Sequence, residues 1–159
     1  MTFDRRSRHS PSRVWSAITD PREVSRWMGY PARIDLKAGG EYFVDFDGTR
    51  EGGLDGVITR VECGRQLRYS WGLSTICWEL EEDDGGCRYR FIHFGQKPRL
   101  IPDEEGLAAG WHAWLEDLEQ YLDGGAPTHE LDSPRWIELK RQYRPLLESA
   151  LGDALTPGE

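Results

Sequence analysis

The spacing of apolar residues changes twice along this chain, and this limits the folds open to it. Between Ala32 and Gly95 apolar and polar residues alternate, whereas the stretches Pro11–Met28 and Leu107–Leu122 repeat their apolar residues every three or four positions. Alternation is typical of strands, and the segments CGR and DDGG have the residues that close antiparallel hairpins. The sequence therefore predicts an α+β protein, an antiparallel meander with one face covered by helices.

The residues before Ala32 predict a strand followed by two short helices. The opening segment, up to Ser10, alternates weakly, as a strand does. Ser10 can cap a helix that starts at Pro11, and Asp20 can cap a second helix that starts at Pro21. The apolar faces of the two helices are formed by Val14, Trp15, Ile18, Val24, Trp27 and Met28.

In the meander, every second side chain is predicted to face the core. The predicted inward sets are Tyr42, Val44 and Phe46; Val57, Thr59 and Val61; Leu67, Tyr69 and Trp71; Ile76, Trp78 and Leu80; and Tyr89, Phe91 and His93. Arg88 and Arg90 fall on the solvent-facing side, where we expect them to pair with acids across the strands. Arg5, Arg6 and Arg8 are interpreted as a solvated end of the first strand.

A long amphipathic helix is predicted after the meander. From Leu107 to Leu122 apolar residues recur at spacings of three and four, which gives about five turns, and Gly124-Gly125 ends the pattern. Such a helix must cover an apolar surface, and the only large one available is the meander. These elements define a first unit, residues 1–125.

Residues 126–159 are predicted to form a C-terminal helical extension. A helix is predicted to begin at Asp132, Ser133 and Pro134 and to carry Trp136, Leu139 and Tyr143. Pro145 should kink or break this helix, because proline removes a backbone donor inside a helix.

Composition favours a small protein of the cytoplasm and excludes several classes of function. The chain has 159 residues, a net charge of −8, no apolar run of membrane-spanning length and no secretory signal. An acidic surface disfavours nucleic acid as a partner. The cysteines Cys63, Cys77 and Cys87 lack zinc spacing and are interpreted as reduced, the last two at strand positions. No motif for a catalytic nucleophile, a metal or a cofactor is found, so we assign no catalytic residue, metal ligand or cofactor.

Aromatic residues give the candidate binding site. Rings are predicted to lie on a short helix, on the sheet and on the long helix, and these elements would enclose an apolar chamber. Tyr69 and His93 would be its polar fixing points. The same rings can equally be ordinary core packing that fills the chamber. The candidate ligand-binding residues are Trp27, Tyr42, Phe46, Tyr69, Trp71, Trp78, Phe91, His93 and Trp111.

Five segments, in order, resemble one known family. They are SPSRVWSAITDPREVSRWM, AGGEYFVDF, GVITRVECGRQLRYSW, WELEEDDGGCRYRFIHFG and GWHAWLEDLEQYL, and they extend from about Arg5 to Gly124. The chain is similar to the activator of heat-shock protein 90 ATPase homologue-like family of the START-related (SRPBCC) superfamily. The resemblance implies a helix-grip (START/Bet v-like) fold, a curved antiparallel sheet around a long C-terminal helix, with an elongated apolar cavity between them.

Three functions are compatible with these observations. The first is a binding protein for a small hydrophobic ligand held between the sheet and the long helix. The second is a polyketide cyclase- or hydrolase-like enzyme with His93 as acid or base, assisted by Tyr69. The third is a co-chaperone-like module that stimulates an ATPase, with Trp136 and Tyr143 as contact surface. The extension would also allow a homodimer. No membrane partner is expected.

Overall fold

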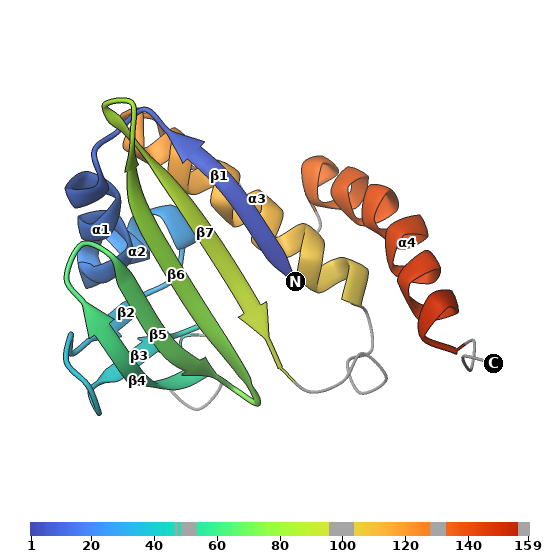
Figure 1. The fold of residues 1–159 in the computed structure, drawn as a ribbon, viewed down its shortest axis with the longest axis horizontal. Helices are drawn as coiled ribbons and strands as arrows, with labels where there is room; N and C mark the ends of the chain where they lie inside the picture. Colours follow the sequence, from blue (N-terminus) through green and yellow to red (C-terminus); the bar gives the residue numbers. More distant parts are fainter. Residues whose placement is uncertain (47, 49–53, 96–103, 128–132, 156–159) are drawn as a thin grey trace.

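The computed structural model describes residues 1–46, 48, 54–95, 104–127 and 133–155. It confirms the α+β helix-grip arrangement, a curved antiparallel sheet with helices on one face (Figure 1). The strands are β1 (Thr2–Ser7), β2 (Ala32–Ile34), β3 (Glu41–Val44), β4 (Leu54–Glu62), β5 (Gln66–Trp71), β6 (Ser74–Asp83) and β7 (Gly86–Phe94). The helices are α1 (Pro11–Thr19), α2 (Pro21–Met28), α3 (Glu104–Leu122) and α4 (Pro134–Leu155).

The first strand joins the meander at its far edge. The seven strands lie in the order β1-β7-β6-β5-β4-β3-β2, and every neighbouring pair is antiparallel. Strands β2 to β7 therefore follow one another as a meander, while β1 pairs with β7 and places Phe3 opposite Phe91. The chain has to pass through α1 and α2 before the meander begins, so these helices lie at one end of the sheet (Figure 1).

The caps of α1 and α2 are those that the sequence predicts. The Ser10 side chain accepts from the Arg13 backbone N–H, and the Asp20 side chain accepts from Arg22 N–H. Both caps satisfy an N–H that has no partner inside its helix. The two helices turn Val14, Ile18 and Trp27 into the core, where all three are buried.

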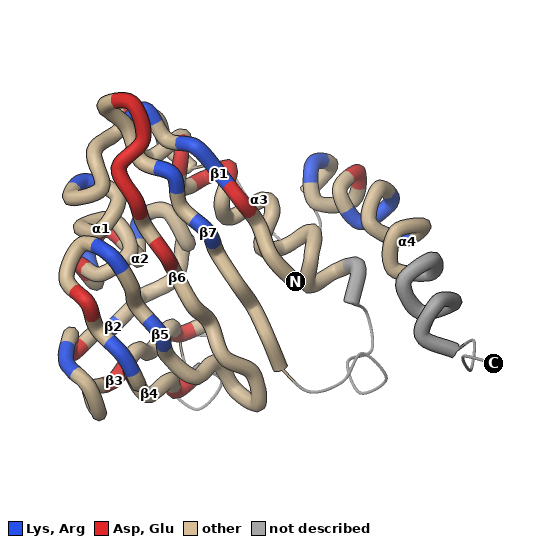
Figure 2. Tube along the Cα trace, viewed as in Figure 1, with Lys and Arg blue, Asp and Glu red and all other residues tan. Residues whose placement is uncertain are grey.

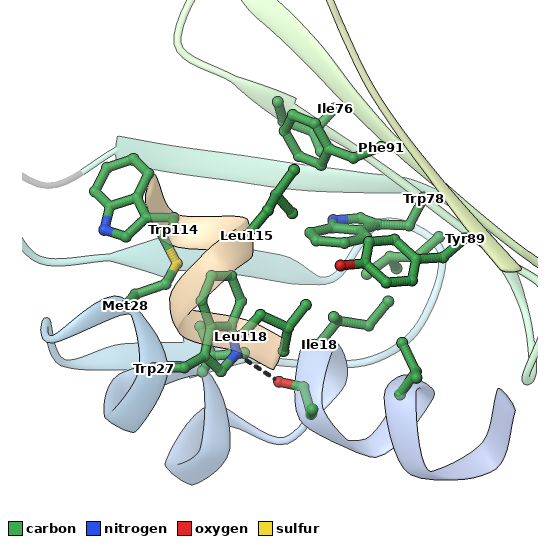
Figure 3. Close-up of a cluster of buried hydrophobic side chains, with 14 of the residues drawn as sticks. Ile18, Trp27, Met28, Ile76, Trp78, Tyr89, Phe91, Trp114, Leu115 and Leu118 are labelled. Carbon is green, nitrogen blue, oxygen red and sulfur yellow. Dashed lines mark hydrogen bonds between the residues drawn. The ribbon is translucent and has the colours of Figure 1, made fainter. Parts of the chain in front are cut away.

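The long helix α3 covers the concave face of the sheet. Figure 3 shows Trp114, Leu115 and Leu118 of α3 between the sheet and the two short helices. Leu115 and Leu118 are fully buried, and the burial of each leucine stabilises the fold by about 2 kcal/mol. The helix ends at Leu122, just before the predicted stop at Gly124, whose φ of 82° is readily adopted by glycine.

Strand β4 contradicts one predicted face. We expected Val57, Thr59 and Val61 to point inward, but Val57 is 52% exposed, Thr59 is exposed, and Ile58 is fully buried. The pairing with β5 shifts register between Ile58 and Arg60. An extra residue in one strand of a pair reverses the faces on its two sides, so Ile58 and Val61 both face the core.

The extension forms one helix that packs along α3. Leu139 is fully buried against Ala109 and Ala113 of α3, with Trp136 beside them. Of the kink or break expected at Pro145, the break is contradicted, since α4 continues to Leu155 with Pro145 inside it. The helices described here include none long and apolar enough to cross a membrane.

Candidate functional site

The aromatic residues predicted for the site do lie together. The rings of Tyr42 and Tyr69 are stacked with centroids 3.8 Å apart, at an interplanar angle of 8°. Phe91 contacts Trp78 at 4.8 Å and Trp111 at 4.4 Å between ring centroids. Trp71, Trp27 and Phe46 extend the cluster through contacts with Trp111, Trp78 and Trp114, respectively. One continuous aromatic cluster therefore joins the sheet, α2 and α3.

The polar atoms of this cluster bind one another or the backbone. The Trp27 indole donates to the Ala17 carbonyl at 2.9 Å, the dashed line in Figure 3. The Tyr42 hydroxyl donates to the Ile18 carbonyl at 3.1 Å. The Trp78 indole donates to the Tyr69 hydroxyl at 3.3 Å. Burial raises the pKa of both phenols above its ordinary value. These groups hold the rings in place and are neutral at physiological pH.

His93 differs from the rest of the cluster. It lies near the end of β7, is 6% exposed, and accepts a 2.9 Å hydrogen bond at Nδ1 from the Trp111 indole. An acceptor at Nδ1 leaves the ring proton on Nε2. Within the described residues Nε2 is buried without a hydrogen-bond partner. Burial lowers the pKa of His93 to about 4, so the ring is a neutral donor at physiological pH.

A cavity of about 690 Å³ lies beside His93. It is bounded by β1, by the ends of β6 and β7, by the first part of α3 and by α4. His93 is the only predicted site residue on this wall; the other predicted residues belong to the packed cluster. The lining residues are Met1, Thr2, Phe3, Asp4, Arg5, Ser74, His93, Phe94, Gly95, Leu107, Ala108, Tyr143, Leu146 and Leu147.

Polar contacts with α3 fix the α4 wall of the cavity. The Tyr143 hydroxyl lies 2.7 Å from Nδ1 of His112 on α3. The Arg135 guanidinium binds both carboxylate oxygens of Glu116. The sequence predicted the apolar face of α4, and one of the three functions compatible with it used Trp136 and Tyr143 as a contact surface for another protein. The structure uses both residues within the chain, against α3.

The opposite face of the sheet carries paired charges. Figure 2 shows acidic residues along β6 beside arginines of β1, β5 and β7. Arg88 lies 3.2 Å from Glu81, and Arg90 lies 2.8 Å from Asp4. This confirms the predicted cross-strand pairing. Exposed pairs of this kind contribute about 0 to 1 kcal/mol each to stability. We therefore interpret this face as solvated surface and not as a binding site.

The predicted cooperation of His93 with Tyr69 has no support in the strand register. Tyr69 on β5 is opposite Ile76 on β6, and Ile76 is opposite His93 on β7. One whole strand therefore separates the two residues, which puts their backbones about 10 Å apart. Their side chains bind Trp78 and Trp111 instead. In the part of the chain that the structure describes, no three potential metal ligands come together.

The comparisons with known proteins agree with this fold. The sequence pattern of the family described as Activator of Hsp90 ATPase homolog 1-like protein matches residues 8–123. Protein MLL2253 from Mesorhizobium loti is 25% identical with a TM-score of 0.71, and the match covers 78% of this chain and 96% of that one. CalU16 from Micromonospora echinospora is 23% identical with a TM-score of 0.73, over 93% of this chain and 85% of that one. No curated protein matches the chain.

Proposed function

Because the chain belongs to the family of Activator of Hsp90 ATPase homolog 1-like proteins, we propose that it uses the helix-grip fold to bind a small, largely apolar molecule. The binding site in this proposal is the cavity between β1, β7, α3 and α4. The observation that supports it best is the cavity itself, about 690 Å³ in volume and walled largely by apolar side chains. Ligand sites in proteins have volumes of about 300 to 1,000 Å³ and linings of this kind.

The packed rings are assigned a supporting role. The Phe91 ring contacts both Trp78 and Trp111. The exposed fraction of each of the three residues is at most 1%. Close packing resists deformation, so this cluster would keep the sheet and α3 at a fixed separation. A binding protein whose wall does not move loses little conformational freedom when its ligand enters.

In this proposal His93, which lines the cavity, supplies a hydrogen-bond donor at Nε2. Side-chain packing buries this atom, so the wall beside it has to shift for a ligand to reach it. Leaving a buried N–H without an acceptor costs about 1 to 3 kcal/mol, and an oxygen atom on a bound molecule would remove this cost. The ring is held in its tautomer by Trp111, so the donor is already prepared before binding. A ligand with an apolar body and at least one acceptor atom fits these features best.

Calorimetric titration tests the proposal. We would titrate decan-1-ol and decanoate into the wild-type protein, a variant with a filled cavity and a control variant. Leu147→Trp places an indole in the cavity, whereas Val57→Trp places one on an exposed strand position. We expect saturable binding of at least one probe, lost in Leu147→Trp and kept in Val57→Trp. Absence of binding, or binding that Leu147→Trp leaves unchanged, would overturn the proposal.

The cytoplasmic location of the protein stays a prediction from its composition.

A further inference from the structure

Arg5 lies on the inner face of β1. Phe3, Arg5 and Ser7 are two positions apart and so share one face of the strand. Phe3 and Ser7 are both 6% exposed, and Arg5 between them is half-buried on the wall of the cavity. We expected Arg5 to be solvated like its neighbour Arg6. Of these two arginines, Arg6 is the one on the outer face, where it binds Asp83.

Two of the acids near Arg5, Asp4 and Glu116, are bound to other residues. Asp4, which also lines the cavity, pairs with Arg90 at 2.8 Å. Glu116 on α3 is bound by Arg135 through both of its oxygens. In the described part of the chain, no carboxylate lies within ion-pair distance of Arg5.

The contacts that Arg5 does make are weak. Its Nη1 lies 3.4 Å from the Asp4 carbonyl, near the limit for a hydrogen bond, and its guanidinium carbon is 5.4 Å from the centroid of the Phe3 ring. The positive charge of Arg5 nevertheless acts on His112 of α3. Burial lowers the pKa of His112, and the charge of Arg5 lowers it further. Arg5 is therefore a half-buried cation that forms no ion pair with a carboxylate of the described residues, although its charge, after that of Arg135, helps to lower the pKa of Glu116.

A guanidinium in this position favours one class of ligand. Its planar group of donors matches the two oxygens of a carboxylate and binds them through parallel hydrogen bonds. The same wall carries the apolar side chains of Phe3, Leu107, Ala108 and Leu147, together with the polar residues Thr2, Asp4 and Ser74. A molecule that satisfies both features has one carboxylate and an apolar body.

We infer that the cavity selects apolar molecules that carry one carboxylate, and that Arg5 is the residue that binds the carboxylate. This inference rests on the proposed function and narrows it to one ligand class. It also gives a role to the arginine-rich first strand. Arg6 binds Asp83 and Arg8 binds Asp123 at the surface, whereas Arg5 would bind the carboxylate of the ligand.

The test compares two probes that differ only at one end. Decanoate and decan-1-ol have the same carbon chain, so their affinity ratio isolates the carboxylate. For the wild-type protein we expect decanoate to bind at least about tenfold more tightly, as for a hydrogen bond to a charged group. In Arg5→Gln the ratio should fall to about one. In Arg6→Gln, which removes a cation from the outer face of the same strand, the ratio should stay at its wild-type value.

Each outcome separates the two proposals. If both probes bind the wild-type protein equally, or if Arg5→Gln keeps the wild-type ratio, the inference about Arg5 is wrong and the binding function stands. If neither probe binds, both fall. Circular dichroism and thermal unfolding would show that Arg5→Gln is folded. A second measurement needs no variant. In the wild-type protein the preference for decanoate over decan-1-ol should decrease with added salt, because salt screens the attraction between the guanidinium and the carboxylate.

Discussion

The indole N–H of Trp111 donates a 2.9 Å hydrogen bond to Nδ1 of His93, and this bond joins α3 to β7 inside the protein. It fixes the imidazole in one tautomer and holds the first part of α3 on the sheet. It is also where the packed aromatic cluster meets the cavity, because His93 lines the cavity and its ring contacts Trp111 of the cluster. The properties of His93 should therefore affect stability as well as binding.

We predict that His93 makes the protein less stable below pH 6.5. Its pKa in the folded protein is about 4, whereas an exposed histidine titrates near 6.5. As the pH falls through this window the unfolded chain takes up the proton first, so the free energy of unfolding decreases. The loss attributable to His93 approaches about 3 kcal/mol at pH 4. It is absent above pH 6.5.

Urea unfolding of the wild type and of His93→Asn between pH 7 and pH 4 measures this effect. Asparagine keeps an acceptor for Trp111 but does not titrate. The wild-type curve should therefore fall more steeply with decreasing pH than that of the variant. Parallel curves would show that the imidazole is not buried as described.

The Glu23 carboxylate is predicted to stabilise the contact of α1, α2 and α3. It accepts hydrogen bonds from Ser16 at 2.5 Å, Arg13 at 2.6 Å and Tyr121 at 3.0 Å. Burial by itself would raise its pKa, but these three bonds lower it. Glu23→Gln should cost about 1 to 2 kcal/mol, since it weakens bonds to a charged group. Asp83→Asn, which weakens a surface pair with Arg6, should cost much less than Glu23→Gln, because water screens exposed charges. Equal losses in urea unfolding would contradict this ranking.

Two glycines should respond in opposite ways to the same substitution. A Cβ atom at Gly56 of β4 would overlap the Ser70 carbonyl oxygen of the paired strand, so Gly56→Ala should destabilise the protein by more than about 2 kcal/mol. At Gly110 of α3 a Cβ would meet only the Trp136 indole nitrogen, at 3.7 Å. Gly110→Ala should stabilise the protein by about 0.5 to 1 kcal/mol, because alanine favours a helix. Thermal unfolding of both variants decides the signs.

How far the sequence could predict this structure depends on whether a feature is local. The inward faces of β5 and β7 follow from the alternation of residues such as Tyr69 and Phe91, which needs no knowledge of the neighbouring strand. The faces of β4 do not, because the register shift near Thr59 is fixed by its pairing with β5. Local hydrophobicity gives no sign of such a shift.

The site was predictable only in part. The alternation of residues correctly predicted that His93 faces inward, and the helical spacing correctly predicted that Trp111 faces the sheet, where it binds His93. The cavity itself depends on where α4 packs, and the sequence of α4 shows an apolar face without showing its partner. Arg5 was missed because its charge suggested solvent, although its position between Phe3 and Ser7 already placed it on the inner face. Strand position was the better indicator.

Removal of residues 126–159 tests the predicted division of the chain. The main core is formed by the sheet, α1, α2 and α3, and Tyr143 is the residue of α4 that, among those described, packs at its margin. Residues 1–125 should therefore still fold cooperatively. They should be less stable than the whole chain, because burial of Leu139 against Ala109 and Ala113 is lost, worth about 2 kcal/mol for the leucine alone.

The same truncation should abolish binding, because Tyr143, Leu146 and Leu147 form one wall of the cavity. Leu139→Ala in the whole chain is the matched variant: it should lower stability by about 2 to 4 kcal/mol and leave these wall residues in the chain. We expect it to weaken decanoate binding far less than the truncation does. A truncated protein that is folded and binds decanoate as the whole chain does would place the ligand between the sheet and α3, and α4 would then have no part in the site.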